Sequence, residues 1–496
     1  MKIQHSQRIR TAHCISIAVI LAASSGLAVA QEFGQADLFS SALRPVWSQP
    51  EAAEPAAVQT ALAGYTATET DSQDGKNRAS FLASSTDDPN WIDEPARLAS
   101  FNAPSGNSPL GVKGMRVGSL TVVPYGRLWA DMLYSTSRAT PGDFILWIDS
   151  EETQGEDTFV IDARRSRIGI DVQGPEVDVF GGMTGGGKVE IDFYGTFANQ
   201  NQTNLRLRHV YWEAKNENLR LLVGQTWDVT SPLLPNTVNF PVGWAVGNIG
   251  FRRTQFRVER HLHLTDDVKL SLQSALAQNI VPDFLDTTGV TRETGDWPMV
   301  EGRMALTFPV LWQQKWTIGW SGHVGETGFD FDTVSPGPRQ LPPQDDARFD
   351  SWSVNADFNL PITDRLGFHG EVFTGSDLSN LLGGIVQGIG LTTRSPIRST
   401  GGWGEIWYDW TSCITTHVGA GIDDPDNDDF MVGRTYNRVI YSNVWVQLTN
   451  NLRTGFEVSS WRTSYQNRTR GTNYPVAGPT RPGKATSLDW TVMYTF

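Results

Sequence analysis

The chain has 496 residues, of which 39% are hydrophobic and 19% charged, and its 54 acidic residues outnumber 40 basic ones for a formal net charge of −14. This acidic balance argues against a nucleic-acid partner, because nucleic-acid-binding surfaces are basic. Beyond the N-terminal 30 residues, no segment approaches the roughly 18 consecutive apolar residues that a membrane helix requires, so helical spanning is excluded.

The first 30 residues have the three parts of an export signal. Lys2, Arg8 and Arg10 form a positive region, residues 15–23 form an apolar region, and an Ala-Val-Ala cleavage site ends at Ala30. The apolar region is too short for an anchor and runs directly into the cleavage site. We therefore expect a signal peptide over 1–30 that is removed after Ala30, and export to the outer membrane of a Gram-negative bacterium.

Residues 31–118 differ in composition and periodicity from the C-terminal three quarters of the chain. They are rich in Ala, Ser, Pro, Asp and Glu and show no sustained period of 2, 3.5 or 3.6 residues. We interpret this stretch as a low-complexity, mostly disordered periplasmic segment. Residues 119–496 are then predicted to form one transmembrane β-barrel.

From residue 122 onward the chain divides into segments of roughly ten alternating residues, the length that a tilted strand needs to cross a bilayer. The fold class is therefore all-β, a transmembrane antiparallel barrel of about 16 strands, although 14 or 18 remain open. The predicted strands are 122–134, 159–173, 186–197, 204–214, 218–227, 251–262, 267–277, 299–309, 315–325, 350–360, 365–374, 399–410, 414–421, 439–449, 452–461 and 486–496.

The connections between these strands alternate in length. Short turns such as 215–217 and 450–451 alternate with long loops such as 278–298 and 326–349. Outer-membrane barrels have this asymmetry, with tight periplasmic turns and long extracellular loops. A soluble β-sandwich would also give many short strands, but its outward faces should be polar.

The last strand ends in alternating large apolar residues: Trp490, Val492, Tyr494 and Phe496. This pattern suits a strand with one face toward lipid and the other toward water. We interpret these four residues as the signal that the barrel-assembly machinery recognises. The 18 tryptophans of the chain suit aromatic girdles at the two membrane interfaces.

The alternation also assigns the two faces of each strand. In strand 186–197, Val189 and Ile191 fall on one face, and Lys188, Glu190 and Asp192 on the other. Since no helices are predicted to cover the apolar face, that face must meet lipid and the charged face must line the lumen.

The early strands place many arginines on the lumen face. A row of guanidinium groups in a confined aqueous channel concentrates anions and can bind carboxylate or phosphate in bidentate fashion. The predicted pore-lining residues are Arg127, Asp131, Arg165, Arg167, Arg206, Arg208, Arg253 and Arg257. The alternative is that such arginines pair with acids to hold the wall, a role that we expect for about half of them. Arg164 and Arg252 fall on the nominal lipid face, where we expect them to snorkel at strand ends.

Two long loops carry apolar residues that would be costly to expose. Loop 228–250 has three prolines and several apolar groups, so we expect it to fold into the barrel and narrow the pore; packing on a neighbouring subunit is the alternative. Loop 375–398 presents the same choice, and its small and apolar residues suit subunit contact.

Catalytic and metal-binding motifs are weak. The histidines have no Gly-x-Ser-x-Gly or His-Glu-x-x-His context. We therefore expect no enzymatic activity, no cofactor and no metal. A porin with an open lumen is favoured, with a barrel enzyme and a plugged structural or adhesin barrel as alternatives.

Five segments together resemble the strand signatures of the DcaP-like porins: YGRLWAD at 125–131, ARRSRIG at 163–169, GKVEIDFYG at 187–195, LRLRHVY at 205–211 and LVGQTW at 222–227. The resemblance implies a sixteen-stranded homotrimeric porin in outer-membrane lipid and lipopolysaccharide. It also implies passive uptake of small anionic solutes such as dicarboxylates, with a phosphate-selective porin as the rival. That family commonly has a periplasmic coiled coil, whereas 31–115 show no heptads, so trimerisation here must depend on the barrel wall and loops.

Overall fold

The computed structural model describes residues 114–496 except 154, 179–181, 196–202, 281–289, 311–313, 336–339 and 471–477. The predicted signal peptide and nearly all of the predicted periplasmic segment lie outside the described residues.

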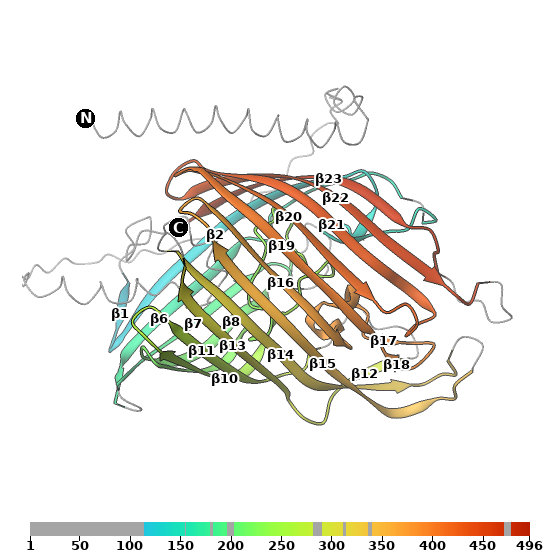
Figure 1. The fold of residues 1–496 in the computed structure, drawn as a ribbon, viewed down its shortest axis with the longest axis horizontal. Coiled ribbons are helices and arrows are strands. Elements are labelled where there is room, and N and C mark those ends of the chain that lie inside the picture. Colours follow the sequence, from blue (N-terminus) through green and yellow to red (C-terminus); the bar gives the residue numbers. More distant parts are fainter. Residues whose placement is uncertain are drawn as a thin grey trace, which may run out of the picture.

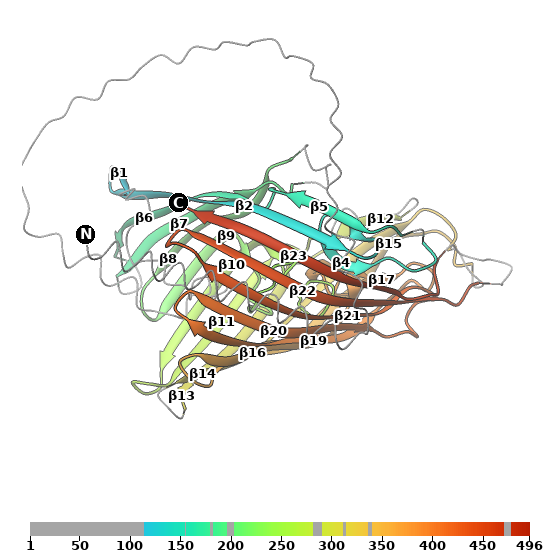
Figure 2. The ribbon, with the colours of Figure 1, turned by 90° about the horizontal axis from the view of Figure 1, so that it is seen from above.

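Within the described part of the chain, sixteen antiparallel strands form a closed barrel, as predicted (Figures 1 and 2). Each strand pairs with the next, and the last pairs with the first. The strands are β2 (Leu120–Ser135), β6 (Arg167–Val177), β7 (Met183–Asp192), β8 (Arg206–Lys215), β9 (Leu219–Trp227), β10 (Arg252–His263), β11 (Lys269–Ala277), β13 (Met299–Pro309), β14 (Lys315–Phe331), β15 (Gln344–Pro361), β16 (Leu366–Ser376), β19 (Arg398–Thr411), β20 (Ile414–Pro425), β21 (Val432–Gln447), β22 (Leu452–Asn467) and β23 (Gly483–Thr495).

The barrel closes where β23 pairs with β2, from Arg127 opposite Thr495 to Ser135 opposite Ser487. Gly126 and Phe496 continue this pairing with two mutual backbone hydrogen bonds of 3.0 Å. A Cβ on Gly126 would lie 2.3 Å from the Phe496 ring, so only glycine fits there. Closure leaves no open sheet edge, which is the condition for a sheet to span lipid.

The remaining elements are short. β1 (Met115–Val117), β5 (Thr158–Asp162) and β12 (Val290–Thr294) extend the barrel sheet, while β3 (Ala139–Pro141) with β4 (Ile145–Ile148) and β17 (Ile389–Gly390) with β18 (Ser395–Pro396) are separate hairpins. Two single-turn helices, η3 (Ser379–Leu381) and η4 (Gly384–Val386), lie in the loop after β16. No helix among the described residues is long and apolar enough to cross a membrane.

The predicted strand 159–173 is interrupted. β5 ends at Asp162 and β6 begins at Arg167, and between them a tight turn is closed by a 3.0 Å hydrogen bond from the Ser166 N–H to the Ala163 carbonyl. The turn breaks the alternation of faces at residues 163–166, which matters for the arginines there.

The strands are apolar outside and polar inside. On β10, Phe256 and Val258 are 64% and 50% exposed, whereas Arg253 and Glu259 are almost fully buried. A closed barrel with this arrangement suits a hydrocarbon surround and an aqueous or loop-filled interior, and it is the architecture of Gram-negative outer-membrane proteins.

The connections differ at the two ends of the barrel. Two to five residues join β8 to β9, β10 to β11, β15 to β16, β19 to β20 and β21 to β22. The start of β2 and the end of β23 lie at this same end, so it faces the periplasm, and the long loops are extracellular.

Candidate pore constriction

The loop between β9 and β10, residues 228–250, crosses the interior of the barrel; we name it the constriction loop. Its first part is held by two glutamates of the barrel wall. Glu301 on β13 accepts a hydrogen bond from the Val229 N–H (2.5 Å), and Glu371 on β16 accepts from the Ser231 hydroxyl (2.5 Å) and the Leu233 N–H (2.6 Å). The prediction that this loop enters the barrel is confirmed.

Two further glutamates hold the middle of the constriction loop. Glu405 on β19 accepts from the Asn236 backbone and side-chain amides, both at 2.9 Å, and Glu457 on β22 accepts from the Val238 N–H at 2.7 Å. All four glutamates are almost fully buried. Four strands thus use one carboxylate each to satisfy backbone donors that would otherwise lack partners in the interior.

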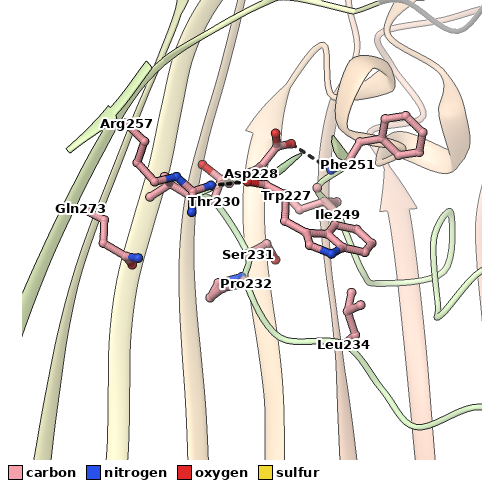
Figure 3. A pocket seen from close by; sticks show the side chains of 12 residues that line it. Trp227, Asp228, Thr230, Ser231, Pro232, Leu234, Ile249, Phe251, Arg257 and Gln273 are labelled. Atoms are coloured by element: carbon pink, nitrogen blue, oxygen red, sulfur yellow. Dashed lines mark hydrogen bonds between the residues drawn. The ribbon is translucent and has the colours of Figure 1, made fainter. Parts of the chain in front are cut away.

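The two ends of the constriction loop are joined by Asp228 (Figure 3). Its carboxylate accepts the Phe251 N–H at 2.8 Å and both the Nε and Nη2 of Arg253, at 2.7 and 2.9 Å. The Asp228 N–H in turn donates to the Phe251 carbonyl at 2.9 Å. The entry and exit of the loop are therefore fixed to each other and to β10.

Two other extracellular loops also turn inward. Phe144 and Trp147 of the β3–β4 region pack in one buried apolar cluster with Trp244 of the constriction loop and Ile385 of η4. Leu381 of the same loop is fully buried, and its carbonyl accepts the Gly250 N–H at 2.8 Å. Loop 375–398 therefore packs inside the barrel. The prediction that its apolar residues contact a neighbouring subunit is wrong, because they pack against the constriction loop of the same chain.

Among the predicted pore-lining residues, Arg165 and Asp131 face each other near β2. The Arg165 guanidinium donates to the Val238 carbonyl of the constriction loop at 2.9 Å and lies 3.5 Å from Asp131. Asp131 also accepts the Thr491 hydroxyl at 2.5 Å. Arg127 is partly buried, four residues earlier on β2.

Arg167, Arg206 and Arg208 gather around two inward carboxylates of β7. Arg206 makes a two-point ion pair with Asp192 (2.9 and 2.6 Å), and Arg208 reaches both Glu190 (2.6 Å) and Asp192 (3.1 Å). Arg167 lies 4.0 Å from Glu190. A break in register between β7 and β8 at this point lets consecutive residues of β8 face inward.

Arg253 and Arg257 on β10 are also paired, Arg253 with Asp228 at 2.7 Å and Arg257 with Glu259 at 3.2 Å. Within the described residues, at least six of the seven predicted arginines thus lie within 4 Å of an acid, more than the half that we expected. These ion pairs hold the barrel wall and the constriction loop together. A role of the arginines in ion selectivity stays a prediction.

Arg252 was placed wrongly by the alternation of faces. It is 3% exposed and lies inside the barrel, with its guanidinium 4.5 Å from the ring centroid of Trp227 and 5.1 Å from that of Phe251. The strand begins at this residue, directly after the constriction loop, so the period of two does not yet apply. No carboxylate of the described residues lies within 4 Å of Arg252, which distinguishes it from its neighbours.

Arg164 is likewise buried rather than at the lipid surface. It lies in the turn between β5 and β6 and pairs with Asp162 at 2.5 Å and with Asp143. The sharp turn, which the sequence pattern did not reveal, carries the side chain inward.

A cavity lies between the arginine wall and the constriction loop. It is a narrow space that opens to solvent, and its lining includes Arg165, Arg208, Arg252, Trp227 and Trp244. The indole N–H groups of both tryptophans and the Nε of Arg165 are buried and have no hydrogen-bond partner among the described residues. These groups are all donors, so the cavity favours a ligand that supplies acceptors.

The four residues predicted to form the C-terminal assembly signal differ in exposure and contacts. Trp490 and Tyr494 face outward and are 40% and 36% exposed, Val492 is half-buried on the same face, and Phe496 lies at the closure against Gly126. Their recognition during assembly stays a prediction. No group of three or more potential metal-ligating side chains occurs among the described residues.

Comparison with known proteins places the fold. The crystal structure of the outer-membrane channel DcaP of Acinetobacter baumannii matches with a TM-score of 0.59 and 15% identity, over 78% of this chain and 100% of that chain. An anion-selective porin from Comamonas acidovorans matches with a TM-score of 0.48 and 12% identity, over 76% of this chain and 100% of that chain. No protein-family model matches the sequence, and no curated protein is similar to it. The resemblance to the DcaP-like porins is thus confirmed for the fold: the chain forms a closed sixteen-stranded barrel similar to that of the DcaP channel.

Proposed function

We propose that this protein is an outer-membrane porin through which small hydrophilic solutes diffuse passively, with a preference for small anions. The fold supports a channel, since the similar barrel of Acinetobacter baumannii is an outer-membrane channel. The constriction loop crosses the interior beside the inward arginines, one of which, Arg165, donates to its Val238 carbonyl.

The single observation that carries the anion preference is the donor-lined cavity at Arg252. The wall carboxylates that face the constriction loop are engaged by loop N–H groups, and Glu190 and Asp192 by arginines. Arg252 has a guanidinium that always carries charge and no acid within ion-pair distance in the described chain. A permeating anion is the partner that this cation and the adjacent indole donors would attract.

Small dicarboxylates are the proposed solutes, because a guanidinium binds a carboxylate in two-point fashion. Phosphate fits the same donors, and competition between the two anions will decide which is preferred.

An enzymatic role finds little support in the described interior. His323 contacts two serines, with Nδ1 2.8 Å from the Ser353 hydroxyl and Nε2 3.0 Å from that of Ser351. Both ring nitrogens are thereby occupied, and a catalytic pair needs a third group to orient the base. We propose that this cluster is structural and that the protein is not an enzyme.

Assembly as a homotrimer is also part of the proposal. The inward packing of loop 375–398 removes one surface that was expected to join subunits. The barrel wall and the other loops are the surfaces that remain for this contact.

The proposal is tested by the ion selectivity of the purified protein in planar bilayers. Reversal potentials in a KCl gradient should indicate preferential chloride permeation, and succinate should reduce the chloride current at lower concentration than phosphate. Absence of conductance, or preference for potassium, would refute the channel or its selectivity, respectively.

A further inference from the structure

Three cationic side chains lie next to one another on the outer surface of the barrel, on the neighbouring strands β21, β22 and β23 (Figure 1). Arg438 of β21 is directly opposite Arg462 of β22, and Arg462 is directly opposite Lys484 of β23. Residues directly opposite in antiparallel strands have Cβ atoms about 5 Å apart. We name these three residues the cationic row.

The cationic row faces outward. On β23 the side chains alternate, so Lys484 shares a face with Leu488 and Trp490, which are 45% and 40% exposed to the surround. Arg462 is exposed and Arg438 is half-buried. Ile440, the next residue on the same face of β21 as Arg438, is 48% exposed. The row is therefore outside the barrel and separate from the constriction.

The height of the row places it at the outer leaflet. Lys484 lies ten residues before Tyr494 on β23, and Tyr494 belongs to the periplasmic end of the outer surface. At about 3.4 Å per residue and a strand tilt of about 40°, this span is roughly 26 Å along the barrel axis, close to the apolar band of roughly 25 Å in such barrels. The row therefore lies where lipid headgroups begin on the extracellular side.

No acidic group of the described residues neutralises the cationic row. No acidic side chain of the described residues lies within 4 Å of these three, and the Nε of Arg438 is buried without a hydrogen-bond partner. Other cations at the extracellular rim are paired: Arg138 with Asp149 (3.4 Å), Arg468 with Asp428 (3.0 Å) and Arg470 with Glu152 (3.0 Å).

Like charges directly opposite each other destabilise a sheet unless a counter-charge is present. Because the outward positions of β21 to β23 contain no acidic residue, that counter-charge must come from outside this part of the barrel wall. At this height, the anions held in place are phosphate groups of membrane lipids. Small ions from solution would leave the Arg438 donor without a fixed partner.

We infer that the cationic row is a binding site for the phosphate groups of an outer-leaflet glycolipid, the lipopolysaccharide of the membrane in which the barrel resides. The guanidinium groups of Arg438 and Arg462 bind phosphate oxygens in two-point fashion, and Lys484 adds a third positive charge. The exposed apolar side chains below the row contact the acyl chains of the same lipid.

The test uses the complete mature protein folded in detergent. Arg438→Gln/Arg462→Gln/Lys484→Gln removes the cationic row, and Arg138→Gln/Arg468→Gln/Arg470→Gln is the matched control with the same change of charge at paired rim cations. Binding of lipopolysaccharide and of its enzymatically dephosphorylated form is measured by native mass spectrometry. Each cation near a lipid surface contributes about fivefold to binding, so the row variant should lose at least about tenfold in affinity. The control variant should stay within about twofold of the wild type.

Three results would overturn this inference: equal binding by the row variant and the wild type, equal loss in the control variant, or undiminished binding of the dephosphorylated lipid. Inorganic phosphate that displaces the lipid at equal molar concentration would show a site for free phosphate and would also overturn it. Heat-modifiable gel mobility checks folding, and Arg462→Gln alone, at an exposed position, should still lose about fivefold. Channel conductance should be unchanged, so this test stands apart from that of the proposed function.

Discussion

Glu371 on β16 accepts a hydrogen bond of 2.6 Å from the backbone N–H of Leu233, a residue 138 positions earlier in the chain. The same carboxylate accepts the Ser231 hydroxyl at 2.5 Å. A fully buried side chain of the barrel wall thus holds the constriction loop across the lumen, and Glu301, Glu405 and Glu457 repeat this contact from other strands.

Replacing Glu371 by Gln should loosen the constriction loop. The amide keeps one acceptor oxygen, so its NH2 group faces either the Ser231 hydroxyl or the Leu233 N–H, and loss of one buried hydrogen bond costs about 2 kcal/mol. Single-channel recordings should show a higher mean conductance and more frequent current fluctuations than in the wild type. Glu176→Gln, at an exposed position of β6, is the control and should leave the recordings unchanged. A Glu371→Gln trace identical to that of the wild type would show that this contact does not hold the loop.

Arg252→Gln should lower the anion preference more than removal of a cation elsewhere on the same strand. Its guanidinium is the cation of the cavity that lacks an acid within ion-pair distance in the described structure. The chloride-to-potassium permeability ratio from reversal potentials should fall by about threefold or more, since loss of one unit charge at close range changes ion energies by about 1 kcal/mol in water. Arg260→Gln, exposed on the outside of β10, should keep the wild-type ratio. Equal ratios for Arg252→Gln and the wild type would assign selectivity to other groups.

Phe496→Ala should weaken closure of the barrel. The Phe496 ring fills the space above Gly126, and its loss leaves a gap at the seam between β2 and β23. Because the ring is only partly buried, we expect a loss of about 2 kcal/mol, less than for a fully buried phenylalanine. The temperature at which the folded band disappears in heat-modifiability gels should fall, and the yield of assembled barrel should fall with it. Tyr494→Ala, on the lipid-facing side, is the comparison; a larger effect there would contradict a special role for the seam.

The extracellular rim should show a pH-dependent loop contact at Glu152. Its carboxylate accepts hydrogen bonds from the Thr480 hydroxyl (2.8 Å) and from Arg470 (3.0 Å), which lower its pKa below the usual value for glutamate. A lowered pKa in the folded protein means that the stabilising contact is present above the usual glutamate pKa and is lost as the pH falls through the folded value.

Carboxyl NMR of the Glu-labelled protein should therefore give Glu152 a midpoint below the usual range. Arg470→Gln should raise that midpoint toward the usual value. A midpoint that is the same in both proteins would show that the ion pair does not form in solution.

Much of the fold follows from the period of two alone. Residues such as Phe256 outside and Arg257 inside are assigned correctly, because lipid and lumen impose opposite polarity on successive positions. Strand ends were less well predicted: β14 and β15 extend beyond the expected bounds to Phe331 and Gln344. In the extension of β14 the inward positions are apolar, because Phe329 and Phe331 are buried in an apolar cluster, so the polar-inside pattern of the transmembrane part is lost there.

The constriction was only partly predictable. Loop 228–250 was expected inside because of its apolar residues, but the four glutamates that hold it were not identified. Glu301, Glu371, Glu405 and Glu457 each lie on the buried, inward face of their strand, and an acid at an alternating position among apolar residues was the signal available. Arg252 and Arg164 could not be placed, because a loop junction and a four-residue turn override alternation there.

The most direct test of the central claim is the reversal potential of the wild-type protein in planar bilayers under a tenfold KCl gradient. The donor-lined cavity between the arginine wall and the constriction loop predicts a potential of the sign set by chloride, shifted toward zero in Arg252→Gln. A potential of the sign set by potassium, or a bilayer that stays non-conducting at protein levels where DcaP forms channels, would contradict it.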